Sequence, residues 1–187
     1  MKTFNNKTNI ALAAMLLIIT FGLSNCKKKT NPPNPNEEEL ITTLQITFQD
    51  SAGVHPDVIA RYKDTDGDGG AAPSTWDSIR LKSNTTYFAS ILLLDVSVSP
   101  ADTISNEVLD EANDHLFCFT VSSVNCNITR TDTDGNGLEI GLQSKWKTGA
   151  IGTGNVQIQL RHQPDSKTGS CNVGSSDIDL LFVLQNQ

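Results

Sequence analysis

The first group of residues that could carry chemistry surrounds His115. Glu111 and Asp114 precede this histidine, and His162 ends a second apolar strand pattern further along the chain. Two imidazole nitrogens with a nearby carboxylate form a ligand set that suits a transition metal. We therefore predict a transition-metal site at these four residues, on the condition that the two strands meet in space. Two buried histidines with ordinary hydrogen bonds are the alternative.

A second group of oxygen donors lies in the segment Asp64-Thr-Asp66-Gly-Asp68-Gly69. It matches the first half of a calcium loop, with carboxylates at positions 1, 3 and 5 and a glycine at position 6 for the sharp turn. Thr75 stands at position 12, where an EF-hand supplies a bidentate glutamate. The pattern therefore predicts a looser Ca²⁺ site in a connection between strands, with a plain β-turn as the alternative.

The segment that contains Asp132, Asp134 and Asn136 repeats this pattern in a weaker form. The dipeptide Asn136-Gly137 is also a strong signal for a tight hairpin. Ca²⁺ is the cofactor expected at these acidic loops, and a hairpin turn without an ion accounts for the same residues.

Signatures of common catalytic classes are missing from the sequence. There is no Gly-x-Ser-x-Gly motif and no His-Glu-x-x-His motif, and the glycines of residues 149–154 lack the Lys-Ser/Thr of a phosphate-binding loop. Trp76 and Trp146 are either ligand-stacking platforms or ordinary core and rim residues. We therefore predict that the protein is not an enzyme.

Strands must position these residues, because apolar and polar side chains alternate with a period of two along much of the chain. The alternation is clearest in residues 44–49 and 156–161. The predicted strands cover residues 44–49, 57–64, 77–82, 87–96, 115–121, 125–131, 143–148, 156–161 and 178–184.

Nine short strands with few helical patterns predict an all-β protein built as a single antiparallel β-sandwich, of immunoglobulin-like or jelly-roll kind. A closed β-barrel is the alternative. One short helix is expected within residues 105–113, with Ser105 as its cap. Residues 40–187 are long enough for one domain of this kind.

The first 25 residues have the features of an export signal. Lys2 and Lys7 are followed by the apolar stretch 10–23, which is too short to span a bilayer comfortably. It leads into Leu23-Ser-Asn-Cys26, which resembles the lipobox of bacterial lipoproteins, although Asn25 departs from the usual small residue. We predict a signal peptide over residues 1–25 and lipidation of Cys26.

Residues 26–39 follow as the lipidated cysteine and a tether. The tether is rich in Pro and Asn and ends in three glutamates, a composition that does not pack into a core. Lys27 stands where an Asp would signal retention in the inner membrane, so the resemblance favours the outer membrane, with the periplasmic or surface face left open. The membrane is thus an expected partner through the lipid anchor.

Three cysteines remain once Cys26 is lipidated. Because the envelope is oxidising, one disulfide is expected and one thiol is left over. Cys118 could pair with Cys126 across a hairpin, and Cys126 could instead pair with Cys171.

The charge of the chain excludes one class of partner. The 187 residues have a formal net charge of −7, and the first 25 contain two lysines and no acid, so the chain from Cys26 onward carries −9. A nucleic-acid-binding protein needs clustered Lys and Arg, and the only such run is residues 27–29 in the tether. Nucleic acid is therefore not an expected partner.

Several segments together resemble a family of small bacterial outer-membrane lipoproteins of unknown function. These segments are residues 26–29, 37–44, 64–70, 81–87, 113–119 and 160–164. The resemblance implies a β-rich domain on a lipid anchor that works beside an outer-membrane transporter. It implies no catalytic residues.

The leading hypothesis is a non-enzymatic, lipid-anchored envelope protein whose β-sandwich binds a partner or a small ligand. One alternative is a metal-dependent envelope enzyme that uses His115 and His162. The other alternative is an adhesion module stiffened by Ca²⁺.

Overall fold

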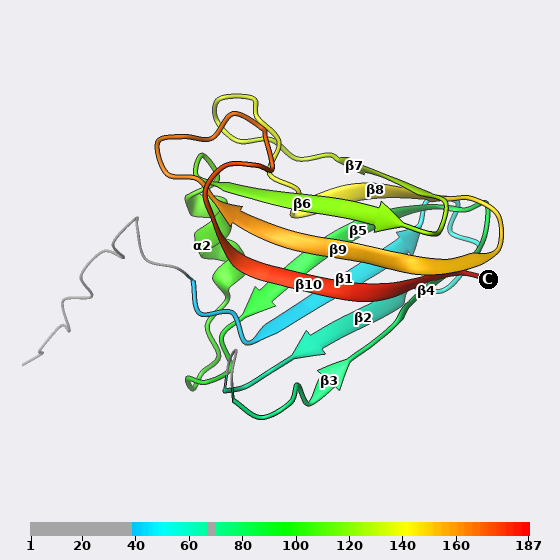
Figure 1. Ribbon diagram of the computed structural model, residues 1–187, viewed down its shortest axis with the longest axis horizontal. Helices are drawn as coiled ribbons and strands as arrows, with labels where there is room; N and C mark the ends of the chain where they lie inside the picture. Colours follow the sequence, from blue (N-terminus) through cyan, green and yellow to red (C-terminus); the bar gives the residue numbers. More distant parts are fainter. Residues whose placement is uncertain (1–38, 67–69) are drawn as a thin grey trace, which may run out of the picture. The chain divides into compact units, whose positions relative to one another are not determined.

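Strands dominate the structure, as the alternating pattern predicts. The computed structural model describes residues 39–66 and 70–187, and these residues form ten strands and one short helix, α2 (Figure 1). In chain order the elements are β1 (Thr43–Asp50), β2 (Val58–Lys63), β3 (Thr75–Trp76), β4 (Ile79–Leu81), β5 (Thr86–Leu94), α2 (Ile104–Asp110), β6 (His115–Ser122), β7 (Cys126–Arg130), β8 (Gln143–Thr148), β9 (Gly152–His162) and β10 (Ser175–Asn186).

The strands form two sheets that pack face to face. One sheet has the order β3-β2-β1-β5-β8-β7, and the other has the order β4-β10-β9-β6. Neither sheet closes on itself, so the predicted β-sandwich is confirmed and the alternative of a closed barrel is wrong. Neighbouring strands are antiparallel in the described residues, except that β4 runs parallel to β10.

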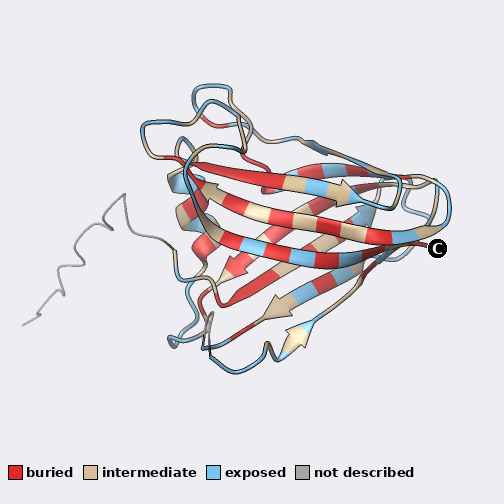
Figure 2. Cartoon of the chain, viewed as in Figure 1, coloured by how far each residue is buried: buried red, intermediate tan, exposed pale blue. Residues whose placement is uncertain are grey.

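The hydrophobic core fills the space between the two sheets. Figure 2 shows buried and exposed residues alternating along the strands, as expected when one face of each sheet is covered. Trp146 is fully buried there, with its ring edge-on to Phe48 at 5.0 Å and to Phe119 at 5.8 Å. Its indole N–H donates to Ser144 Oγ at 2.9 Å. Trp146 is therefore a core residue, whereas Trp76 is 51% exposed.

Two local features differ from the predictions. The helix begins at Ile104 and ends at Asp110, and it has no side-chain cap. The Ser105 hydroxyl instead accepts a hydrogen bond from the Leu93 N–H at 2.5 Å, so it ties α2 to β5. Strand β3 was not predicted, because two residues are too few to show an alternation.

Cys118 and Cys171 form a disulfide, so neither of the two pairings considered from the sequence is present. The reason is the direction of the side chains. Cys126 on β7 packs against the core between the sheets, whereas Cys118 alternates with the core residue Phe117 on β6 and faces outward. Among the described residues, Cys126 therefore remains a thiol, and burial raises the pKa of that thiol to about 11.

Removing the disulfide should destabilise the fold. The two cysteines are 53 residues apart. A cross-link that closes a loop of that length lowers the conformational entropy of the unfolded chain, which stabilises the fold by about 4 kcal/mol. We expect the double variant Cys118→Ala/Cys171→Ala to lose free energy of unfolding of that order in urea titrations. Peptide mapping without reductant should recover Cys118 linked to Cys171 in both the wild type and the Cys126→Ser control. A cross-linked peptide that contains Cys126 would contradict this pairing.

Candidate metal centre

The pairing of β6 with β9 brings the two predicted histidines together. His115 is the first residue of β6 and His162 is the last residue of β9, and the antiparallel register sets them directly opposite each other. Their rings stack with centroids 4.8 Å apart and planes 7° apart. Both residues are buried, with exposed fractions of 0% and 3%. The condition for the predicted site, that the two strands meet, is therefore fulfilled.

Two carboxylates reach this pair of rings. Glu111 follows α2, and one ligand atom from each of Glu111, His115 and His162 lies within 4.8 Å of the other two. Asp177 Oδ2 lies 3.7 Å from His115 Nε2, and neither side chain is exposed. Ligand atoms that hold a tetrahedral ion at about 2.1 Å lie about 3.4 Å from one another. These groups would therefore have to move closer to one another to hold an ion.

The hydrogen bonding of His115 leaves one ring nitrogen available to a metal. Nδ1 lies 3.1 Å from the carbonyl oxygen of Glu111, and because a carbonyl can only accept, Nδ1 carries the proton. The other nitrogen, Nε2, then has a lone pair. Among the described residues it has no hydrogen-bond partner, and neither has Nε2 of His162. Metal-bound histidines usually donate their second N–H in this way.

Burial also keeps His115 in the form that binds metals. Removal from water lowers the pKa of His115 to about 4, so its imidazole is uncharged at neutral pH. Burial likewise raises the pKa of the Glu111 carboxyl. A cation placed between these groups would reverse the effect on Glu111, because it favours the charged carboxylate, and it would further disfavour a proton on the His115 nitrogen.

Glu39 adds a further carboxyl group from the segment just before β1. It is in hydrogen-bond contact with the carboxyl group of Glu107 on α2. Burial raises the pKa of Glu39 to about 7, and the negative charges of Glu107, Glu111 and Asp177 contribute to the shift. This part of the molecule thus has an excess of carboxyl groups.

Lys167 does not balance those carboxyl groups. Its ammonium group lies 2.8 Å from Asp134 Oδ2 and 2.7 Å from the carbonyl oxygen of Ala112, and both side chains of this ion pair are buried. Its ion pair is therefore made with Asp134 and not with the carboxyl groups beside the two histidines.

Asp177 is the residue that the sequence does not predict. Strict alternation along β10 would turn it outward, since Ile178, Leu180 and Phe182 face the core. The register between β9 and β10 shifts between Ser176 and Ile178, as in a β-bulge, and the side chain of Asp177 is completely buried. Bulges are known to redirect side chains beside functional sites. The serines and glycine before Asp177 are a weak signal for such an irregularity.

Asp114, predicted as a ligand, does not belong to the converging group. It acts on His115 only as a nearby charge. Its carbonyl oxygen instead accepts the Gln163 N–H at 2.6 Å, which connects β6 to the loop after β9. Asp177 is likewise outside that group, but its Oδ2 lies 3.7 Å from His115 Nε2.

The first acidic loop is only partly described. Asp64 Oδ2 accepts the Tyr62 hydroxyl at 3.2 Å, and Asp66 Oδ2 accepts the Ala71 N–H at 2.8 Å. Asp68, the third predicted Ca²⁺ ligand, lies outside the described residues. The structure therefore describes two of the three carboxylates that were predicted to bind Ca²⁺.

The second acidic loop uses its side chains to hold a turn. Asp132 accepts the N–H groups of Gly141 and Gln143, and Asp134 accepts those of Asn136 and Leu138. Burial alone would raise the pKa of Asp134, but the Lys167 ammonium and the backbone N–H groups outweigh it and lower that pKa. These bonds correspond to the hairpin alternative considered from the sequence.

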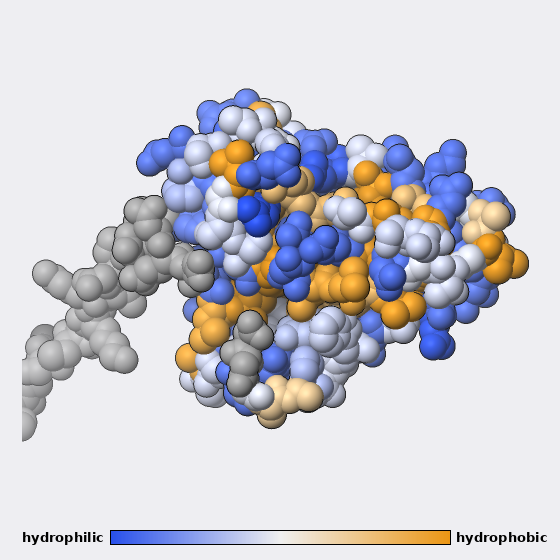
Figure 3. Space-filling model, in the orientation of Figure 1, coloured by the Kyte–Doolittle hydropathy of each residue, from blue (hydrophilic) through white to orange (hydrophobic). Residues whose placement is uncertain are grey.

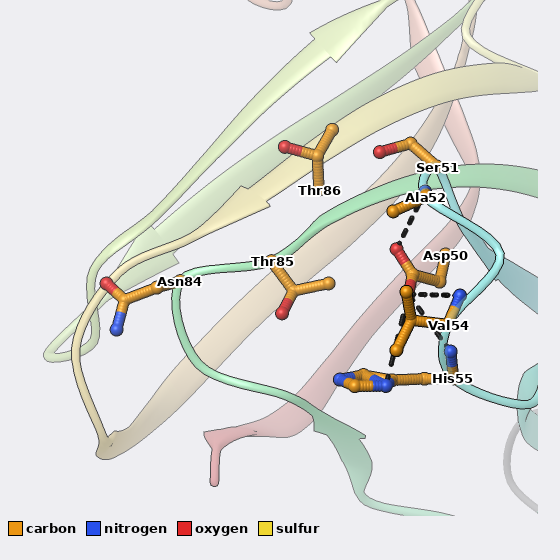
Figure 4. A pocket seen from close by; sticks show the side chains of 8 residues that line it. All are labelled: Asp50, Ser51, Ala52, Val54, His55, Asn84, Thr85 and Thr86. Carbon is orange, nitrogen blue, oxygen red and sulfur yellow. Dashed lines mark hydrogen bonds and ion pairs between the residues drawn. The ribbon is translucent and has the colours of Figure 1, made fainter.

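The third histidine, His55, lies beside a hollow of about 260 Å³ at the other end of β1 (Figure 4). Asp50 lines this hollow, and its two carboxylate oxygens accept hydrogen bonds from the N–H groups of Ala52, Val54 and His55. His55 Nδ1 is 4.0 Å from Asp50 Oδ2. The Asp50 carboxylate is thus committed to the loop, which makes this hollow a poor metal site.

Replacing Glu39 should change how the stability of the metal-free protein depends on pH. The pKa of His115 is about 4 in the folded protein and 6.5 ordinarily. Between these two values the unfolded chain binds more protons than the folded one, so the fold loses stability as pH falls from 6.5 toward 4. The pKa of Glu39, about 7 when folded and 4.5 ordinarily, has the opposite effect, so the fold loses stability as pH rises from 4.5 toward 7.

The two trends oppose each other in the wild type, and Glu39→Gln removes one of them. We expect the free energy of unfolding of E39Q, measured in urea with a chelator, to rise more steeply than the wild type's between about pH 5 and pH 6.5. The His115 contribution is about 3 kcal/mol over its full range. Asp165→Asn, an exposed change elsewhere, is the control. If the free energy of unfolding of E39Q and of the wild type changed equally with pH, the opposing effects of Glu39 and His115 would be contradicted.

Comparisons of the chain with protein-family models, with curated proteins and with solved structures give no significant match. Within residues 39–66 and 70–187, no helix has the length and hydrophobicity needed to cross a membrane. The case for a function therefore rests on the geometry of the candidate metal centre.

Proposed function

We propose that this protein is a lipid-anchored, non-enzymatic binding module of the bacterial envelope whose β-sandwich holds a divalent transition-metal ion. The observation that carries the proposal is the pair of buried Nε2 atoms, on His115 and His162, that have no hydrogen-bond partner among the described residues. One ligand atom from each histidine also lies within 4.8 Å of a ligand atom of Glu111, and His115 Nε2 lies 3.7 Å from Asp177 Oδ2. Leaving such atoms without a partner is costly in an apolar interior. We propose that one metal ion is the missing partner of both nitrogens.

The ligand types favour an ion of the zinc class. His115 and His162 offer imidazole nitrogen, and Glu111 and Asp177 offer carboxylate oxygen. Zinc accepts both donor types in a four-coordinate site. Cys118, on the same strand as His115, offers no thiolate, because it forms the disulfide with Cys171.

The lipid anchor is the second part of the proposal. Residues 1–38 lie outside the described part of the chain, so the signal peptide, Cys26 and the tether up to residue 38 are supported by the sequence alone. Lipidation at Cys26 would hold the domain at the outer membrane, where a metal-binding module could serve a membrane-embedded partner such as a transporter.

A metal-dependent envelope enzyme is the second candidate function. One observation favours it: a cleft of about 610 Å³ has Glu39 and Asp177 in its lining, so a substrate bound there would lie beside the metal centre. Hydrolysis of a test ester that stops on chelation and in His162→Gln would favour the enzyme. A metal-loaded protein without turnover favours the binding module.

Zinc binding tests the main proposal. We expect calorimetric titration of the metal-free protein with Zn²⁺ to give one ion per chain. His115→Gln and His162→Gln should weaken binding by about 100-fold or more, and Asp177→Asn by about 10- to 100-fold. Zn²⁺ should also raise the melting temperature of the wild type, because it binds only the folded chain.

His55→Ala is the matched control, since His55 lies outside the metal centre. Circular dichroism of each variant checks that it is folded. If the affinity for Zn²⁺ were the same in the wild type, H162Q and D177N, a zinc site at these residues would be contradicted.

Anchoring is tested at Cys26. We expect the wild-type protein to fractionate with membranes and its precursor to accumulate when globomycin blocks the lipoprotein signal peptidase. Cys26→Ala should release the protein from the membrane fraction, because the lipid provides the attachment. A Cys26→Ala protein that fractionates like the wild type would contradict lipid anchoring.

A further inference from the structure

The cleft beside the metal centre has features of a second binding site. It is lined by residues of β2, β3 and β10, of the connection between β2 and β3, and of the segment before β1. On the face seen in Figure 3, hydrophobic surface is exposed along β10. The cleft lining contains four acidic residues and no Lys, Arg or His. Its volume of about 610 Å³ is that of a small-molecule site.

One wall of the cleft is aromatic. The rings of Tyr62 and Trp76 meet edge to face, with centroids 5.2 Å apart and planes at 82°. Trp76 remains 51% exposed, and Leu40 on the same cleft is 56% exposed. Large apolar side chains left open to solvent beside a concave surface are typical of a ligand site.

Asp64 provides a buried acceptor in this cleft. It is only 5% exposed, and its Oδ2 accepts the Tyr62 hydroxyl. Its Oδ1 is buried and has no hydrogen-bond donor among the described residues, and no ion pair to Asp64 occurs there. The neighbouring Asp66 carboxyl contacts Asp64 but brings another acceptor. A cation with N–H groups is the partner that this arrangement lacks.

We propose that the cleft binds an organic cation with an apolar body, whose ammonium group donates to Asp64 Oδ1 while its body packs against Trp76. Packing of the apolar body against the aromatic ring adds to the ion pair, and the ion pair strengthens where water is excluded. A bare metal ion would leave the aromatic wall unused, and an anion would meet the carboxylates. The proposal goes beyond the metal site, because neither His115 nor His162 lines the cleft.

The test uses 2-phenylethylammonium as the probe, with 2-phenylethanol and 3-phenylpropionate as neutral and anionic analogues. We expect tryptophan fluorescence and calorimetry to show saturable binding of the ammonium probe with a Kd of about 1 mM, as suits so small a ligand. The neutral analogue should bind about tenfold more weakly or worse, and the anion should not bind.

Two variants locate the site. Asp64→Asn keeps the shape of the side chain and removes its charge, and Trp76→Ala removes the aromatic wall. Each variant should therefore bind the ammonium probe about tenfold more weakly than the wild type. Asp165→Asn and Phe88→Ala are controls, because both residues are exposed and neither lines the cleft. Both controls should bind the probe as the wild type does.

Three results would overturn the proposal. One is equal affinity for the ammonium probe and 2-phenylethanol. Another is an affinity for the probe that D64N leaves unchanged. The third is Ca²⁺ binding that depends on Asp64 while the probe fails to bind, since that would make the segment a metal loop. None of these results bears on zinc binding, so this proposal can fail while the metal centre stands.

Discussion

The register of β6 on β9 is the constraint on which the rest of the structure depends. It sets His115 opposite His162 and, on the same face, Phe117 opposite Leu160. Because side chains alternate with a period of two, a slip of one residue would turn both the aromatic core residues and the histidine outward. The same pairing therefore builds the core and the candidate metal centre, and neither can change without the other.

The loop between β9 and β10 positions Asp177 relative to the two histidines. Three contacts hold the loop: the disulfide from Cys171 to Cys118, the ion pair of Lys167 with Asp134, and the amide of Gln163, which donates to the carbonyl oxygens of Ser170 and Val173. Gly174 ends it with φ +78°, where a Cβ would lie 2.0 Å from the His162 carbonyl oxygen. The loop is thus fastened on both sides of the point where the chain turns back to the histidines.

Much of the fold could be predicted from the sequence because one face of each sheet is buried. Alternation, together with one continuous apolar run at residues 87–96, located the nine longer strands. It also placed His115 and His162 on core faces, and their convergence then required only that the two strands pair. Alternation fails where the backbone departs from regularity. The bulge before Ile178 is why Asp177 was missed, and contact between Glu39 and Glu107 joins residues far apart in the chain.

The disulfide illustrates the same limit. Spacing along the chain makes Cys118 and Cys126 near neighbours, but only the folded sheets reveal that one faces outward and the other faces the core. Trp76 on β3 and Asp64, directly after β2, likewise line one cleft, which no local pattern predicts. In each case tertiary packing decides what local sequence leaves open.

The most direct test is crystallographic. Crystals of the described domain grown with Zn²⁺, with data collected on both sides of the zinc absorption edge, would show any bound ion by its anomalous signal. We expect one peak, about 2.0–2.2 Å from a ring nitrogen of His115 and of His162, with Asp177 or Glu111 as a further ligand. An anomalous map with no peak between the two histidines, while zinc is bound elsewhere or not at all, would contradict the account.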